Sequence, residues 1–437
     1  MRKILANIGW IFFDKIFRMA IGMLVSLWIA RYLGPAEFGV LNYATLFPTI
    51  LAAFAGFGLT NTLMVEFVSN NGNPLEQRRL LQTGLFIKLL AGCLMYGLSC
   101  CLNYILNRDN PQLFFLINVT GLILILQSSD IIDTYFQSQT KAKLSVVVKL
   151  ISFGLASIIR VYALLTKQGI LFLALINIAE MVIVYGLIVG IYQNRIAKIA
   201  SNFRQAISYE LIGQLLRISW PIMITEFFVF VYMKVDQFMI ESLSTDKELG
   251  LYGAALRLSE TWYFIAIAIN TSFYPKIAES WSVNKEKFYK QYQELINVLT
   301  YISIALAIFV SLFSHQLIDL LYGADYEHAA IILSVHIWAG VFVFTGVGTN
   351  NLMIIKNLQK FVLIKTIAGA FINVYLNYLL IPEFGALGAS IATLIAYGLQ
   401  AYVLNLFFKP ARTVFNLQSK SFINFLTLQR PMTVKIS

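Results

Sequence analysis

The sequence predicts an all-α integral membrane protein with about twelve transmembrane helices, and its composition and apolar runs both support this class. Of its 437 residues, 58% are hydrophobic and only 13% are charged, and the mean hydropathy is +0.72. A soluble domain carries about 25% charged residues. The apolar residues also gather in runs of the length that crosses a hydrocarbon core, which takes about 20 residues.

Twelve such runs follow one another along the chain, separated by short polar connections. Arg2 and Lys3 precede the first run as in a signal peptide, but no small-residue cleavage site follows, so we expect this helix to be retained. The runs cover residues 8–31, 39–66, 80–106, 112–137, 144–166, 168–192, 217–242, 250–275, 294–321, 329–355, 361–382 and 386–409.

Lysine and arginine predict the orientation. They are concentrated in one alternating set of connections, with 21 against 4 in the other set. Positive residues mark the cytoplasmic side of a membrane protein. An even number of spans with both termini in the cytoplasm is therefore predicted.

The chain also carries a weak internal repeat. Trp10 opens the first run and Trp220 the seventh, and GPAEFGVLNYA (Gly34–Ala44) is echoed by TDKELGLYGAA (Thr245–Ala255). Six spans per half give two halves of the same orientation. We expect two pseudo-repeated six-helix lobes, 1–192 and 217–409, joined by a basic cytoplasmic loop at 193–216 and followed by a basic cytoplasmic tail at 410–437.

The sequence lacks the motifs that are typical of several classes of protein function. The chain has no phosphate-binding G-x-x-x-x-G-K-[ST] loop, its three cysteines lack metal or disulfide spacing, and its three histidines stand in no catalytic or zinc motif. The net charge of +11 is spread over short loops, with no basic domain that would bind nucleic acid. We expect neither an enzyme nor a metal or cofactor site.

Charged residues inside the apolar runs are the strongest functional signal. Each costs roughly 2.5–3.5 kcal/mol near the middle of a spanning helix, so a paired or wet interior is predicted. The basic set is Lys15, Arg18, Lys88, Lys149, Arg160, Lys234, Arg257 and Lys365. The acidic set includes Asp14, Glu66, Asp130, Asp133, Glu180, Glu226, Asp236, Glu241 and Glu260.

Spacing suggests partners for some of these charges. Asp14 and Arg18 are four residues apart and share a helix face, so Arg18 either pairs with Asp14 or contacts substrate. Arg257 and Glu260 are three apart and offer a second internal pair, while Glu226 and Lys234 fit one polar face of the seventh run. Lys149, Arg160 and Lys365 lie near run ends, where we expect them to snorkel to the membrane surface.

The second run contains a candidate gate. Pro48 lies near its centre, and Gly56 and Gly58 follow. Proline removes a helical hydrogen bond and favours a kink, which either bends during transport or stays fixed by packing.

Six segments, in order along the chain, carry a family resemblance that runs from about residue 5 to 409. The segments are LANIGW (Leu5–Trp10), IARYLGPAEFGVLNYA (Ile29–Ala44), SWPIMI (Ser219–Ile224), DKELGLYGAALRLSE (Asp246–Glu260), LLYGADYEHAAIIL (Leu320–Leu333) and NYLLIPEFGALGASIATLIAYG (Asn377–Gly398). They resemble the polysaccharide-transporter branch of the multidrug/oligosaccharidyl-lipid/polysaccharide (MOP) exporter superfamily, which includes the O-antigen or Wzx-type flippases.

The resemblance implies a central cavity, lined by the first, second, seventh and eighth helices, that opens alternately to each side. It implies that cations of this cavity receive a pyrophosphate, and here they would be Lys15, Arg18, Lys234 and Arg257, with Arg31 near the external mouth. Asp14, Glu226, Asp236 and Glu260 would serve ion coupling or charge pairing. Trp262, Tyr263 and Tyr274 either stack on sugar rings or pack in the core.

The implied function is flipping of undecaprenyl-pyrophosphate-linked oligosaccharide repeat units across the bacterial inner membrane, for O-antigen, exopolysaccharide or capsule synthesis. Membrane lipids would be partners, with a glycan polymerase and a chain-length regulator as further ones. The alternatives are a drug or metabolite exporter of the same superfamily, a membrane glycan polymerase or glycosyltransferase, and a scaffold for glycan enzymes.

Overall fold

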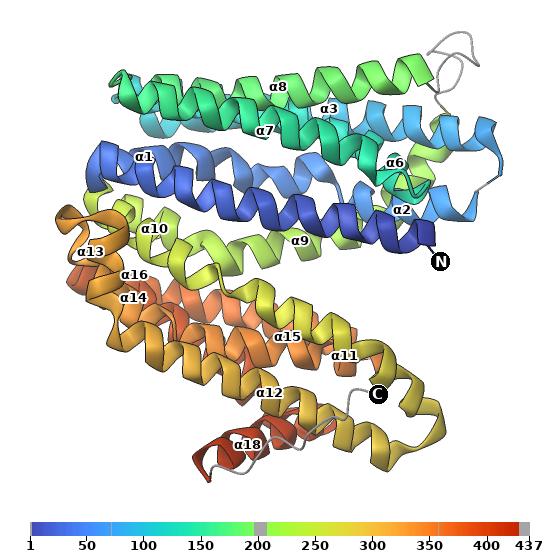
Figure 1. Cartoon of the computed structure of the whole chain (residues 1–437), viewed down its shortest axis with the longest axis vertical. Helices are drawn as coiled ribbons and strands as arrows, with labels where there is room; N and C mark the ends of the chain where they lie inside the picture. Colours follow the sequence, from blue (N-terminus) through green and yellow to red (C-terminus); the bar gives the residue numbers. More distant parts are fainter. Residues whose placement is uncertain (1, 71, 196–207, 357, 428–437) are drawn as a thin grey trace. The chain divides into compact units, whose positions relative to one another are not determined.

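The computed structural model describes residues 2–70, 72–195, 208–356 and 358–427, and these residues form helices and no strand (Figure 1). Nine stretches of the described chain are long and apolar enough to cross a membrane. Phe13–Ser69, with 57 residues, and Gln359–Phe407, with 49, are each long enough for two crossings. Seven stretches with one crossing each, these two with two each, and one more formed by α10 (Asp246–Glu260) and α11 (Tyr263–Val283) match twelve crossings. The predicted fold class is confirmed.

The chain divides into two compact units. Unit 1 comprises Met1–Leu33 and Val40–Phe230, and unit 2 comprises Gly34–Gly39 and Val231–Ser437. Each unit is described by itself below. The lobe limits expected from the sequence stay a prediction, and residues 196–207 of the expected inter-lobe loop lie outside the described residues.

Unit 1 is built from the first eight α-helices, a short 3₁₀ turn and the first part of a ninth helix. Its elements are α1 (Arg2–Gly56), α2 (Leu59–Ser69), α3 (Pro74–Asn107), α4 (Pro111–Gly121), α5 (Ile123–Leu126), η1 (Gln127–Ser129), α6 (Asp130–Ser138), α7 (Ala142–Leu165), α8 (Ile170–Arg195) and α9 (Tyr209–Leu243) up to Phe230.

Unit 2 holds the remainder of α9 and all later elements. These are α10 (Asp246–Glu260), α11 (Tyr263–Val283), α12 (Lys285–Leu312), α13 (Ser314–Tyr322), η4 (Ala324–Tyr326), α14 (Ala329–His336), α15 (Ala339–Ile355), α16 (Gln359–Gly398), η5 (Leu399–Val403), α17 (Leu404–Phe407), η6 (Lys409–Ala411) and α18 (Arg412–Leu426).

Polar caps start several helices where the sequence leaves an apolar run. The Asn73 side chain accepts a hydrogen bond from the Glu76 backbone N–H, with Pro74 in the first turn of α3. Thr245 accepts one from the Glu248 N–H at the start of α10. These caps satisfy N–H groups that have no partner within the helix.

Each unit has its own apolar core. In unit 1, α2 contributes Leu59, Leu63 and Phe67, which pack with buried residues of α3 and α6. In unit 2, α12 contributes Phe288, Tyr292 and Leu295, which pack with α15 and α18. A helix with buried side chains on one face gains its stability largely from this packing.

The helical path breaks at few places. Backbone angles leave the helical region at Gly34 inside α1 and at Gly385 inside α16, so each of these long elements is two helices joined at a kink. The chain stays helical through Pro48, and the break between α1 and α2 comes at Phe57 and Gly58, both with positive φ. The gating role of Pro48, Gly56 and Gly58 stays a prediction.

The first part of the predicted tail is a helix that docks on unit 2. Val414, Leu417, Gln418 and Ser421 of α18 are buried, and the Gln293 side chain on α12 donates a 3.0 Å hydrogen bond to the Leu417 carbonyl. With 15 residues, the helix is too short to span a membrane. Residues 428–437 of the tail lie outside the described residues.

The two segments of the sequence repeat touch each other. A Cβ atom placed on Gly39 would lie 1.9 Å from the Asp246 carbonyl oxygen, and one on Gly250 would lie 1.8 Å from that of Pro35. The parts in contact, Gly34–Gly39 of the first segment and the second segment, belong to unit 2. Only glycine allows the two backbones to approach this closely.

Replacing Gly250 with alanine should therefore destabilise the protein. The added Cβ must push the 34–39 segment away from α10, which we expect to cost about 1–3 kcal/mol, the usual range for overpacking. Gly97→Ala is the matched control, because no atom lies within 4 Å of its Cβ position. Thermal unfolding in detergent would measure the effect, and equal Tm values for the two variants would contradict it.

Candidate functional site

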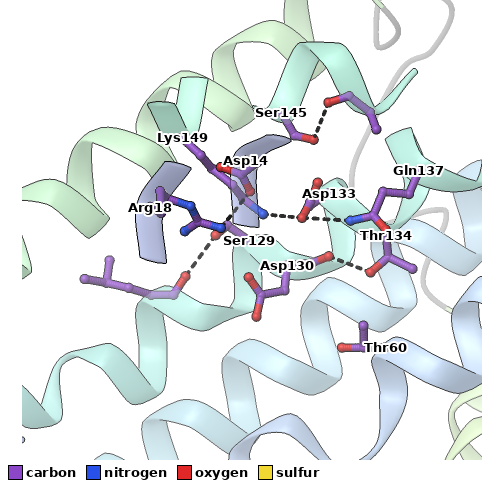
Figure 2. Close-up of polar contacts among 12 residues, drawn as sticks. Asp14, Arg18, Thr60, Ser129, Asp130, Asp133, Thr134, Gln137, Ser145 and Lys149 are labelled. Carbon is purple, nitrogen blue, oxygen red and sulfur yellow. Dashed lines mark hydrogen bonds and ion pairs between the residues drawn. The ribbon is translucent and has the colours of Figure 1, made fainter. Parts of the chain in front are cut away.

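The charged residues of the first helix form one short contact. Arg18 Nη2 donates to Asp14 Oδ2 at 2.7 Å, and the side chains are 38% and 7% exposed. The contact predicted from their spacing is present (Figure 2). Arg18 Nε donates to no described residue, so the guanidinium, with five N–H donors, keeps bonding capacity beyond Asp14.

The other two cations that the resemblance assigns to the pyrophosphate in unit 1, Lys15 and Arg31, lie at the surface. Lys15, next to Asp14, is exposed. Arg31 is also exposed and lies one turn before the break at Gly34. The structure therefore places Lys15, Arg18 and Arg31 along one helix, at increasing distance from its start.

A further ion pair joins α7 to α6. Lys149 Nζ donates to Asp133 Oδ2, and Gln137 Nε2 donates to the same oxygen at 3.1 Å. Asp133 lies between its two donors in Figure 2. The expectation that Lys149 snorkels to the membrane surface is wrong, because its ammonium turns inward to this carboxylate.

Arg160 and Lys365 also turn into the protein. Arg160 Nη2 donates to Glu180 Oε2 at 2.6 Å and to Asn177 Oδ1 at 2.8 Å, which ties α7 to α8. Lys365 of α16 is 3% exposed and lies 3.4 Å from Asn405 Oδ1. Snorkelling is therefore wrong for both, since burial with polar partners replaces contact with the membrane surface.

Unit 2 pairs its central cation with a residue other than the expected one. Lys234 Nζ on α9 lies 3.0 Å and 3.1 Å from the two oxygens of Glu260 on α10. Glu260 thus forms its ion pair with Lys234, and the predicted Arg257–Glu260 pair is absent from the ion pairs of the described residues. Spacing along one helix missed this partner because it lies on a neighbouring helix.

Arg257 has an aromatic environment instead. Its guanidinium carbon lies 5.4 Å from the centre of the Phe38 ring, and Phe38 packs edge-on against Tyr326. Burial raises the pKa of Tyr322 to about 12, although Arg257 acts against the rise, so this phenol stays neutral. Arg257 is exposed and forms no ion pair within the described chain, which leaves its charge available.

Asp236 is the most deeply buried acid among the candidates of unit 2. It is 3% exposed. The Tyr252 hydroxyl donates to its Oδ2, the Gln237 backbone N–H donates to Oδ1 at 2.8 Å, and Thr393 Oγ1 lies 3.4 Å from Oδ2. Hydrogen bonds from neutral groups thus surround the carboxylate.

Glu226 and the aromatic candidates complete the predicted set. Glu226 is exposed and accepts a 3.3 Å hydrogen bond from Asn61 Nδ2 within unit 1. Trp262 and Tyr263 pack against the core of unit 2, while the side chain of Tyr274 lies outside the described residues. No metal-binding group of three or more His, Cys, Asp or Glu side chains occurs in the described parts of the chain.

The fold defines the class of this chain as a multi-pass helical membrane protein, and solved structures share this fold. The inward-facing conformation of a multidrug resistance MATE family transporter of the MOP superfamily superposes with a TM-score of 0.73, at 14% identity, over 95% of this chain and 96% of that one. The lipid II flippase MurJ, in an inward closed conformation, gives 0.67 at 16% identity, over 97% and 92%. At these identities the similarity shows that the chain shares their fold.

The family follows from the sequence itself. A family model described as "Polysaccharide biosynthesis protein" matches residues 28–331, which is more than half of the chain, so the protein belongs to this family. An uncharacterized membrane protein of Methanocaldococcus jannaschii is 24% identical over 430 residues, covering 90% of this chain and 82% of the relative. The predicted family resemblance is thereby confirmed.

The Lys149–Asp133 contact allows a test of charge pairing inside unit 1. Lys149→Met should destabilise the protein by about 3–5 kcal/mol, because it leaves Asp133 buried without its cation. Lys149→Met combined with Asp133→Asn should recover most of that loss, since no uncompensated charge remains. Chemical unfolding in detergent measures all three proteins, and a double variant no more stable than the single one would contradict the pairing.

Proposed function

We propose that the protein is a secondary transporter that flips undecaprenyl-pyrophosphate-linked oligosaccharide repeat units from the cytoplasmic to the outer leaflet of the bacterial inner membrane. Membership of a polysaccharide biosynthesis family together with a MOP transporter fold supports this proposal. The single observation that carries it is that each unit has an arginine with bonding capacity to spare, Arg18 in unit 1 and Arg257 in unit 2.

The chemistry of the cargo explains why such arginines are needed. A pyrophosphate brings at least two negative charges into a low-dielectric cavity, and water is lost as it enters. Guanidinium groups replace that water with charge-assisted hydrogen bonds, often two at a time. Lys15 and Arg31 add positive charge along α1, and Lys234 adds it in unit 2.

In the absence of substrate, the acids beside two of these cations hold them in ion pairs. Asp14 holds Arg18 by one of its nitrogens only, and Glu260 holds Lys234. In the proposed cycle, the pyrophosphate competes with these carboxylates for the cations. Its release on the outer side lets the internal pairs form again, which prepares the site for the next molecule.

The transport cycle is proposed to proceed by alternating access. The head group enters the cavity from the cytoplasmic side, and the polyprenyl tail stays in the bilayer. Return of the empty transporter is coupled to a cation gradient through Asp236, because this buried carboxylate has neutral partners and no ion pair among the described residues. A glycan polymerase and a chain-length regulator would take the product.

Neutralising both arginines should abolish transport. Arg18→Gln with Arg257→Gln removes charge-assisted hydrogen bonds, each worth roughly tenfold or more in affinity. We expect loss of surface glycan in a strain that depends on this protein, with normal protein abundance in the membrane. Arg79→Gln is the matched control, because Arg79 is exposed in the first turns of α3 and pairs with the half-buried Glu76. Unchanged glycan display in the double variant would contradict the site.

Replacing Asp236 should uncouple transport from its driving gradient. Asp236→Asn keeps the size of the side chain but removes its charge, so a coupling cation loses its partner. We expect flipping in proteoliposomes to become insensitive to an imposed sodium or proton gradient. Glu76→Gln makes the same carboxylate-to-amide change in the first turn of α3, where Glu76 pairs with Arg79, and should retain the wild-type response. A gradient response retained by Asp236→Asn would rule out this coupling residue.

A further inference from the structure

Unit 1 carries a group of polar side chains that the proposed pyrophosphate site does not use. They come from four helices, and we call them the Lys88 face. The face consists of Thr60 and Asn61 on α2, Lys88 on α3, Asp130 on α6 and Glu226 on α9.

Lys88 is the centre of this face and its only buried member. The residue is 2% exposed, and its Nζ lies 3.6 Å from Asp130 Oδ2 and 3.4 Å from Thr60 Oγ1. Both distances exceed those of a strong ammonium contact, which are about 2.7–2.9 Å. Lys88 is therefore held by loose contacts that a better partner can replace.

The other four members are open to the surroundings. The Asp130 side chain is 52% exposed, and Thr60, Asn61 and Glu226 are exposed as well. Glu226 is tied to the group by its 3.3 Å hydrogen bond from Asn61 and by its electrostatic interaction with Lys88. Exposed carboxylates and amides are costly against lipid, so this face must meet water or a polar ligand.

Asn61 and Asp130 also lie at similar depths. Asn61 is eight residues from the end of α2 at Ser69, and Asp130 is eight residues from the end of α6 at Ser138, so each lies about 12 Å from that end. The predicted topology puts both ends on the cytoplasmic side. Lys88 lies deeper on α3, but helical side chains slant toward the helix N-terminus, which brings its ammonium back toward the others.

The chemistry of the face suits sugar hydroxyls. Two carboxylates accept hydrogen bonds from hydroxyl pairs, while an ammonium, an amide and a hydroxyl donate to hydroxyl and ring oxygens. The face has two negative charges and one positive charge, so it repels a further anion. This arrangement contrasts with the arginines proposed for the pyrophosphate.

We infer that the Lys88 face binds the sugar part of the lipid-linked substrate and selects uncharged, hydroxyl-rich residues over acidic ones. The inference rests on the proposed function and adds the substrate class to it. The sugar hydroxyls replace water at Thr60, Asn61, Asp130 and Glu226, and the loosely held Lys88 ammonium donates to a sugar oxygen. A uronic acid at this place meets two carboxylates and is disfavoured.

Binding measurements on the full-length protein in nanodiscs test the inference without requiring transport. Three probes share one short polyprenyl pyrophosphate: a form without sugar, a form with a neutral hexose disaccharide, and a form in which one hexose is a uronic acid. We expect the neutral form to bind about tenfold more tightly than the other two, the value of one or two charge-assisted hydrogen bonds.

Two variants test whether the Lys88 face causes the preference for the neutral-sugar probe. Glu226→Gln removes a carboxylate that forms no ion pair among the described residues, so folding should be preserved. Asp130→Asn removes the second carboxylate, but it also takes the counter-ion from buried Lys88. Each variant should reduce severalfold the ratio of the affinity for the neutral-sugar probe to the affinity for the uronic-acid probe. Its affinity for the sugar-free probe should stay unchanged. Glu76→Gln, on the exposed first turn of α3, is the control and should keep the wild-type ratio.

The outcomes separate the two proposals. Equal binding of all three probes by the wild type overturns the sugar face and leaves the pyrophosphate site intact. A neutral preference that persists in Glu226→Gln likewise overturns the assignment to this face. Failure of the wild type to bind any of the three pyrophosphate lipids overturns the proposed function, and the sugar face with it.

Discussion

The structure depends on one constraint, the neutralisation of charges that the sequence places inside the membrane. Five cations of the spans each have a carboxylate within ion-pair distance: Arg18 with Asp14, Lys88 with Asp130, Lys149 with Asp133, Arg160 with Glu180, and Lys234 with Glu260. Four of these pairs join different helices. They therefore hold helices in register, because shifting one helix by a turn would leave a charge unpaired in a low-dielectric medium.

The pairs differ in how tightly they hold their cations, and this difference bears on function. Arg160 has a short contact and an additional amide partner, which suits a permanent link between α7 and α8. Lys88 has only loose contacts, Arg18 uses one nitrogen, and Arg257 rests on an aromatic ring. Lys88, Arg18 and Arg257 can therefore bind a ligand at little cost in free energy, since few strong bonds must break.

Glycine provides the other constraint, at the contact between the two repeat segments. Their resemblance was visible in the sequence as an echo between residues 34–44 and 245–255. Only the structure shows that Gly39 and Gly250 lie where the segments meet, each against the backbone of the other. The repeated glycine thus serves a close backbone approach, and it is not simply a remnant of duplication.

The sequence by itself determined the membrane class, the number of spans, the family and which residues carry charge into the bilayer. These follow from apolar run length and local motifs, which are properties of neighbouring residues. The i,i+4 contact of Asp14 with Arg18 was predictable for the same reason. The partners of Lys88, Lys149, Arg160 and Lys234 were not, because they lie on other helices and depend on how those helices pack. Tertiary structure alone decided that basic residues near span ends turn inward, since a carboxylate or amide on a neighbouring helix offers a closer partner than the membrane surface.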